Sequence, residues 1–181
     1  IHDGHNAAAS LLVDGNLQFA IEEERLTHIK NHSAFPVNSI NFILKSSGLS
    51  VGDFDNFIFS SNHIPTYKNR TELMLEYKEA SSLCAYLKRA AKRKIIYNYV
   101  VKKRTNERIK MALDLGFKHE QILFVDHHLS HASAAYFASP WWRKEKVLVL
   151  TNDGGGDGLC ATVSVGENGK LTKLTSVPVS E

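Results

Sequence analysis

The chain has 181 residues, of which 43% are hydrophobic and 23% are charged, and its net charge is +3. This is the composition of an ordinary globular protein, and it excludes an intrinsically disordered or collagen-like chain. No apolar run approaches the roughly 18 residues that a membrane span needs, and two cysteines cannot make a disulfide framework, so we expect a cytoplasmic protein without a membrane segment. The chain begins without Met and ends within a predicted strand, so we also expect it to be a piece of a longer protein.

The first third of the sequence predicts a hairpin, a helix and a strand. Residues 7–13 and 17–21 are predicted strands on either side of Asp14-Gly15-Asn16, which is a typical hairpin turn. An apolar stripe of helical spacing over residues 36–48 begins at a proline and ends at a glycine, the residues preferred at these two ends of a helix. Residues 54–60 predict the next strand.

The middle of the sequence is predicted to be helical from residue 67 to residue 116. Its segment 88–110 holds ten lysines and arginines against one acidic residue. Such a segment can attract the phosphates of a nucleic acid or a nucleotide, but no aromatic-rich nucleic-acid motif accompanies it. We therefore interpret it as the solvated face of one or two helices, and we do not expect a nucleic-acid partner.

The last third predicts a short strand at 122–125, a helix at 126–138 and further strands. Residues 147–151 are almost entirely apolar, which is typical of a strand buried on both faces of a parallel sheet. Two more strands are expected at 159–165 and from residue 171, separated by a turn at residues 167–169.

An Asp-Gly turn followed by strand, turn and strand occurs twice, once after Asp3 and once after Asp153. This repetition predicts two lobes of related topology, with residues 1–146 as the first lobe and residues 147–181 as the beginning of the second. The alternative is two unrelated hairpins.

Three histidines occur within five residues immediately after the strand at 122–125. His127 and His131 are four residues apart, so on a helix they share a face with their Cβ atoms about 6 Å apart, and two imidazoles so placed can hold one divalent metal ion. The sequence has His128, and not a glutamate, where a zinc peptidase helix needs its base, so a peptidase is not indicated. Polar packing of the three rings is the alternative.

A glycine-rich segment at residues 153–158 is the second candidate site. Its four glycines allow backbone N–H groups to approach an anion closely, and the carboxylates of Asp153 and Asp157 can contact a metal ion or a metal-bound phosphate. The segment is neither a Walker loop nor a Rossmann fingerprint, because it lacks Gly-Lys-Ser/Thr and a strand follows it. A flexible acidic turn is the alternative. The third candidate is the polar cluster from His2 to Asn6.

Together these clusters resemble the N-terminal part of the O-carbamoyltransferases, which act in antibiotic tailoring and in the decoration of nodulation factors. The motifs of the resemblance keep the family's order along the whole chain, at residues 5–15, 22–27, 127–132 and 153–158. More distantly, the chain is similar to the tRNA threonylcarbamoyl-transfer enzymes and to the actin, sugar-kinase and heat-shock ATPase fold. The resemblance implies an α/β chain with this two-lobed fold, whereas the region 61–110 matches no family motif.

The resemblance implies a two-part enzyme. A C-terminal domain, outside this sequence, makes carbamoyl-adenylate from carbamoyl phosphate and ATP with Mg²⁺, and the part described by this sequence transfers the carbamoyl group to a hydroxyl of a small molecule. By the same resemblance, His127, His131 and Asp153 bind a divalent metal ion, either iron or, alternatively, zinc or manganese, and a further aspartate ligand comes from beyond residue 181.

The resemblance also implies roles for residues outside the metal centre. His5 is a functional position, either an acid/base or an oxyanion donor, and Asp3 is its orienting partner. The carbamoyl phosphate or nucleotide would be contacted by the remaining residues of the site, which are Lys30, Gly154, Gly155, Gly156 and Asp157. Two other functions stay open: a non-catalytic ATP-binding regulatory module of the same fold, which would bind nucleotide without this metal, and a sugar or acetate kinase, which does not need the His pair.

Overall fold

The computed structural model describes residues 1–62 and 83–179. It is a mixed α/β structure with small sheets, and the part of the predicted central helix at residues 67–82 lies outside the described residues. The elements, in chain order, are β1 (Ala8–Val13), β2 (Asn16–Glu22), α1 (Glu24–Thr27), α2 (Val37–Ser47), a 3-10 helix (Val51–Asp53), β3 (Phe57–Phe59), α4 (Leu83–Asp114), a second 3-10 helix (His119–Gln121), β4 (Ile122–Phe124), α5 (His127–Phe137), β5 (Val147–Gly156), β6 (Leu159–Glu167) and β7 (Lys170–Pro178).

The N-terminal residues connect two short strand pairs into one hydrogen-bonded series. Strands β1 and β2 are antiparallel, and β3 and β4 are parallel. His2 forms an antiparallel bridge with Ala8 of β1, while the Ile1 carbonyl accepts a hydrogen bond from the Ser60 amide at the end of β3. The order of neighbouring segments in this series is therefore β2, β1, residues 1–2, β3 and β4. We call this series, together with helix α2 that packs on it, the first unit.

Helix α2 begins and ends where the sequence predicts. Pro36 is its N-cap, and Gly48 ends it in the left-handed conformation, with φ of 71°. Ile40 and Ile43 of α2 pack into a buried core with Ala9 and Leu11 of β1 and with the aromatic rings of β3. The predicted strand at 54–60 is shorter than expected: β3 covers Phe57–Phe59, and a 3-10 helix at Val51–Asp53 with a capping box at Ser50 precedes it.

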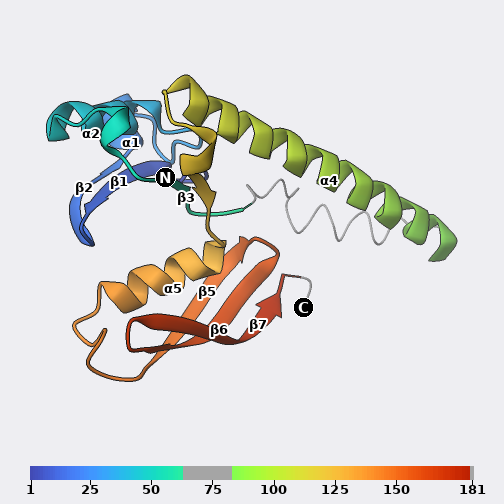
Figure 1. Ribbon diagram of the computed structural model, residues 1–181. Helices are drawn as coiled ribbons and strands as arrows, with labels where there is room; N and C mark the ends of the chain where they lie inside the picture. Colours follow the sequence, from blue (N-terminus) through green and yellow to red (C-terminus); the bar gives the residue numbers. More distant parts are fainter. Residues whose placement is uncertain (63–82, 180–181) are drawn as a thin grey trace.

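Strands β5, β6 and β7 form a separate three-stranded antiparallel sheet, with α5 along one face (Figure 1). Val149 of β5 is buried against Ala132 and Tyr136 of α5. On the opposite face, Leu148 and Leu150 are 61% and 65% exposed. The prediction of a parallel, doubly buried strand at 147–151 is therefore wrong: in the described residues the strand pairs antiparallel and only alternate side chains are covered.

All three tight hairpins use the same backbone geometry. The two-residue loops Asp14–Gly15, Asp157–Gly158 and Asn168–Gly169 have positive φ at both positions. This geometry is that of a type I′ turn, whose twist matches that of the flanking strands and which favours Asp, Asn and Gly. It explains why the Asp14–Gly15 and Asn168–Gly169 signals located their hairpins correctly. The turn expected at Asp153–Gly154 was placed wrongly: β5 continues to Gly156, and the chain reverses at Asp157–Gly158.

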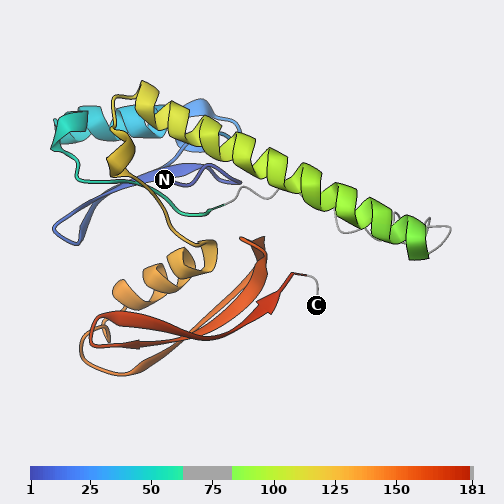
Figure 2. The same ribbon diagram turned by 45° about the vertical axis from the view of Figure 1, so that its right-hand side comes forward.

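Helix α4 is long, and its last turns pack on the first unit. Ala112 lies in the core there, whereas the N-terminal end of the helix projects away from both sheets in Figures 1 and 2. Within residues 1–62 and 83–179, no helix combines the length and apolar character of a membrane span.

Candidate metal centre

The start of α5 presents two imidazoles on one face. Asp126 is the N-cap, and its side chain accepts a hydrogen bond from the Leu129 amide at 2.9 Å, so the helix begins at His127, directly after β4. The rings of His127 and His131 have centroids 4.6 Å apart, and their Nε2 atoms are separated by 3.0 Å. The predicted i, i+4 arrangement is present.

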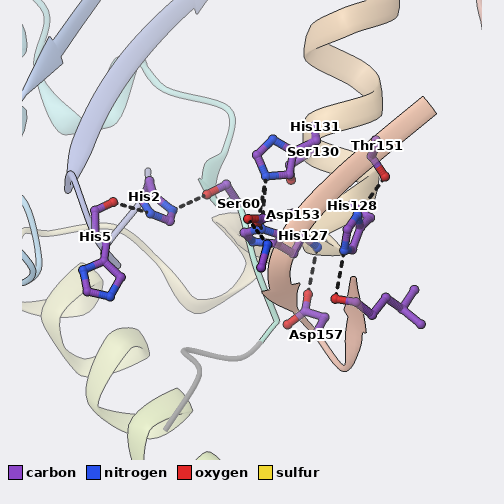
Figure 3. Close-up of polar contacts among 12 residues, drawn as sticks. His2, His5, Ser60, His127, His128, Ser130, His131, Thr151, Asp153 and Asp157 are labelled. Carbon is purple, nitrogen blue, oxygen red and sulfur yellow. Dashed lines mark hydrogen bonds and ion pairs between the residues drawn. The ribbon is translucent and has the colours of Figure 1, made fainter. Parts of the chain in front are cut away.

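Strand β5 brings a carboxylate to the same point (Figure 3). Asp153 Oδ2 lies 2.7 Å from His127 Nε2 and 3.4 Å from His131 Nε2. Three ligand atoms thus converge from two elements, and within the described residues they form the one group of three or more His, Cys, Asp or Glu ligand atoms that could hold a metal ion. The side chain of His127 is 14% exposed and that of His131 is 53% exposed, so the centre opens to solvent on one side.

The geometry of these three atoms fits a metal ion. His127 Nε2 has either one hydrogen or one lone pair, so it cannot both donate to Asp153 and accept from His131. A single cation at the centre satisfies all three groups. In a tetrahedral zinc site with bonds of about 2.0–2.1 Å, ligand atoms lie about 3.3 Å apart. The His131–Asp153 separation of 3.4 Å matches this value, and the other two separations, 3.0 and 2.7 Å, are shorter.

The carboxylate of Asp153 is held ionised, as a metal ligand must be. The hydrogen bond from His127 lowers the pKa of Asp153, burial opposes this, and the Gly154 amide and the charges of the two imidazoles lower it further. The Gly154 amide donates to Asp153 Oδ1 at 2.6 Å, which leaves Oδ2 facing the histidines.

The backbone of Gly156 lies directly against the His127 imidazole. A Cβ atom at this position would overlap the His127 imidazole, whereas a Cβ at Gly154 would meet nothing within 4 Å. Both glycines have ordinary negative φ, so the need for glycine at position 156 is steric. The third glycine of the group, Gly155, has φ of 148°, a conformation that side chains rarely adopt.

The third histidine of the cluster has a structural place. His128 is 1% exposed, with Nδ1 2.7 Å from Thr151 Oγ1 and Nε2 3.0 Å from the Leu159 carbonyl. A carbonyl only accepts, so Nε2 is a donor, and in the neutral ring Nδ1 accepts from the Thr151 hydroxyl. Thr151 in turn contacts Thr162 Oγ1 at 2.7 Å. His128 therefore fastens α5 to β5 and β6.

The turn at residues 3–6, expected to hold a His5–Asp3 pair, is arranged differently from that expectation. The His5 ring is exposed and makes no hydrogen bond to a described residue; its backbone carbonyl contacts His2 Nε2 at 2.9 Å (Figure 3). The Asp3 carboxylate is buried on Arg108 of α4, with Oδ1 accepting from Nη2 at 3.0 Å and Oδ2 at ion-pair distance, 2.9 Å, from Nε.

No individual role was predicted for Arg108, or for His2 beyond its place in the cluster from His2 to Asn6. Arg108 is one of ten basic residues in its segment, and its spacing of four from the buried Ala112 is the signal that could have distinguished it. His2 Nδ1 lies 3.2 Å from Ser60 Oγ; burial lowers the pKa of His2, and the charge of His127 acts in the same direction. The predicted contact Lys30 is exposed in the loop after α1.

Comparison with known proteins assigns the family. The family model described as the carbamoyltransferase N-terminus matches residues 1–181. The chain belongs to this family. The carbamoyltransferase N-terminus is thus represented here by the whole sequence, including the region 61–110 for which no family motif was found.

Relatives of this carbamoyltransferase N-terminus come from bacteria and an archaeon. The chain is 30% identical over 98% of its length to Nodulation protein NolNO of Sinorhizobium fredii, of which the match covers 23%. It is 30% identical over 93% of its length to an uncharacterised protein of Synechocystis, of which 27% is covered, and 28% identical over 94% to one of Methanocaldococcus jannaschii, of which 25% is covered. The chain thus spans about a quarter of the length of these relatives.

Proposed function

We propose that this chain is the carbamoyl-transferring part of an enzyme that moves a carbamoyl group from carbamoyl-adenylate to a hydroxyl of a small molecule. The observation that carries the proposal is the convergence of His127, His131 and Asp153 on one point, in a chain of the carbamoyltransferase N-terminus family. The carbamoyl-adenylate would be made from carbamoyl phosphate and ATP with Mg²⁺ by a C-terminal domain, and the reaction would take place in the cytoplasm.

The actin-like fold is part of this proposal. The hydrogen-bonded series β2, β1, residues 1–2, β3 and β4 supports a first lobe at 1–146, and the meander β5–β6–β7 supports the start of a second lobe at 147–181. Each lobe then begins with three neighbouring antiparallel segments that are consecutive in sequence. These are residues 1–2, β1 and β2 in the first lobe and β5, β6 and β7 in the second. Helix α5 belongs to the first lobe by sequence but packs on the sheet of the second, so it joins the two.

The residues of the chain have distinct tasks in the proposed reaction. His127, His131 and Asp153 would hold a divalent ion, either iron or, alternatively, zinc or manganese, and this ion would neutralise charge on the phosphate or carbamoyl oxygen. Backbone groups of Gly154, Gly155 and Gly156, with Lys30, would bind the phosphate region, and Asp157 would reach it through a metal ion bound to the phosphate. His5 is exposed and unpaired with described residues, so its ring is available to accept the proton of the acceptor hydroxyl. Asp3 would act through Arg108, by holding this turn.

Metal content tests the centre directly. We expect about one equivalent of divalent transition metal in protein purified without chelators, and loss of this metal in the variant His127→Ala/His131→Ala. Elemental analysis of both proteins measures it, with circular dichroism as the control for folding. Equal metal content in the two proteins would remove the His pair from the site.

Separate assays of the two half-reactions test the transfer step. In the full-length enzyme, His5→Asn should lower transfer from preformed carbamoyl-adenylate by about 10² to 10⁴, the usual loss for a general acid/base, and leave adenylate formation intact. Transfer at the wild-type rate would exclude a catalytic His5. ATP binding without bound metal and without transfer would favour the regulatory module instead.

A further inference from the structure

The Asp157 carboxylate lies at the junction of three segments that are far apart in sequence. Its Oδ2 accepts a hydrogen bond from the His127 amide and another from the Asn62 amide, each at 2.8 Å. One amide is at the start of α5, the other follows β3, and Asp157 itself is in the β5–β6 turn (Figure 3). The carboxylate therefore connects both sheets and the helix between them.

Residues 61–62, which Asp157 binds through the Asn62 amide, are also bound by Arg108. Arg108 Nη1 donates to the Ser61 carbonyl at 2.9 Å and lies 3.3 Å from the Asn62 carbonyl, while the same guanidinium binds Asp3. Asp157 also acts on Arg108 electrostatically, since its charge, after burial and Asp3, is among the causes that set the pKa of Arg108. Asp3, Arg108, residues 61–62, Asp157 and His127 thus form one continuous polar chain.

We propose that Asp157 is a positioning residue for the metal ligand His127: it clamps the start of α5 to the end of β3 and so sets where the His127 imidazole stands. This role rests on the metal site proposed above. It differs from the nucleotide contact that the family resemblance implies for this residue.

The physical argument concerns the backbone of the ligand itself. The His127 amide is one of the first N–H groups of α5, which have no partner within the helix, and a carboxylate is the acceptor that the positive end of a helix favours. Hydrogen bonds to a charged acceptor are stronger than those between neutral groups. The His127 amide donates to Asp157, and the His127 ring packs against the Gly156 backbone. These two contacts leave His127 little freedom to move away from Asp153.

The variant Asp157→Asn tests the clamp with little disturbance of the turn. Asparagine has nearly the same size and tolerates the φ of 51° at this position, but it removes the charge. Asp126→Asn is the matched control, because Asp126 caps the same helix end through Leu129 and makes its side-chain bond away from His127. Three measurements compare these variants with the wild type: Co²⁺ affinity, amide hydrogen exchange in metal-free protein, and the ¹⁵N resonances of the His127 ring.

For Asp157→Asn we expect Co²⁺ binding to weaken on the order of tenfold, the low end of the range for residues that orient metal ligands. The amides of Asn62 and His127 should exchange faster, and the His127 ring resonances should shift. Asp126→Asn should accelerate exchange at Leu129 and keep the wild-type Co²⁺ affinity.

Wild-type Co²⁺ affinity in Asp157→Asn would overturn the positioning role, as would equal Co²⁺ loss in Asp126→Asn. If the wild type and His127→Ala/His131→Ala bind Co²⁺ equally, the proposed metal site is wrong, whatever the result for Asp157. The ¹⁵N resonances of the His127 ring then test whether Asp157 positions this residue, since an unchanged His127 signal in Asp157→Asn contradicts that role.

Discussion

The absence of a side chain at Gly156 leaves room for the His127 imidazole. We predict that Gly156→Ala displaces the His127 imidazole and weakens Co²⁺ binding on the order of 10–100-fold, because the added Cβ would occupy the space of the ring. Gly154→Ala is the control, since open space surrounds that position and its backbone conformation suits alanine. Titration with Co²⁺ followed by its absorption spectrum measures both. Comparable affinity in the two variants would mean that the ring does not rest on position 156.

Glu23 is a buried carboxylate whose role is structural. It is 2% exposed, and its two oxygens accept hydrogen bonds from both the backbone and the side chains of Asn38 and Ser39, at 2.6 to 3.0 Å. Burial raises the pKa of Glu23, but the hydrogen bonds from Ser39 and Asn38 outweigh it and hold the pKa below its ordinary value of 4.5. The residue therefore stabilises the start of α2 against the end of β2 in its ionised form.

The lowered pKa of Glu23 predicts a pH dependence of stability. Its contribution is complete above pH 4.5 and is lost as the pH falls below 4.5 through the lower pKa of the folded state. Glu23→Gln should cost about 1–3 kcal/mol in free energy of unfolding at pH 7, and the difference from the wild type should shrink on acidification. Urea unfolding between pH 7 and pH 3 measures this, with Glu22→Gln as control, because the Glu22 side chain is 46% exposed. A difference that stays constant with pH would contradict it.

At the scale of the element, helix α4 is attached to the first unit through a buried charge. Arg108 is 3% exposed, its guanidinium lies 4.3 Å from the ring centroid of Phe59 and 4.9 Å from that of Phe124, and it pairs with Asp3. Desolvation by burial lowers the pKa of Arg108, and Asp3 counteracts it. A segment interpreted from the sequence as a solvated face therefore also contains an anchoring cation.

Removing that cation should be far more costly than removing a surface one. We predict that Arg108→Ala lowers the free energy of unfolding by about 3–5 kcal/mol, because it leaves the Asp3 carboxylate buried without a partner. Lys103→Ala, which removes an exposed pair with Glu107 at 4.0 Å, should cost no more than about 0.5 kcal/mol. Chemical denaturation measures both, and a small effect at Arg108 would show that the buried pair does not hold α4.

At the scale of the whole molecule, the sheet β5–β7 has one covered and one open face. We predict that Val149→Ala, on the face covered by α5, costs about 1–3 kcal/mol, whereas Leu148→Ala on the open face stays within about 0.5 kcal/mol. Thermal unfolding of the two variants measures the difference. Equal losses would support the burial on both faces that the apolar sequence of the strand suggested.

The predictions that succeeded concern neighbours in the chain. Pro36 and Gly48 delimit α2, the Asp-Gly and Asn-Gly turns delimit the hairpins, and Asp126 begins α5, because these residues act on their own backbone. The burial of the strand at 147–151 was predicted wrongly. When both faces of a strand are apolar, the sequence does not indicate that only one face is covered.

Residue spacing and motif order were enough to predict most local elements, the shared face of His127 and His131 and the family to which the chain belongs. A helix repeats its geometry every 3.6 residues, and the motifs of a family keep their order along the chain. The family resemblance named Asp153 as a ligand together with these histidines, but the tertiary structure was needed to show that its carboxylate lies beside them. The burial of His128 between α5 and the sheet, and the contact of the Gly156 backbone with the His127 ring, could be seen only in the structure. Only the tertiary structure joined Asp3 to Arg108, 105 residues apart. Such contacts depend on strand register and helix packing, which no local spacing encodes.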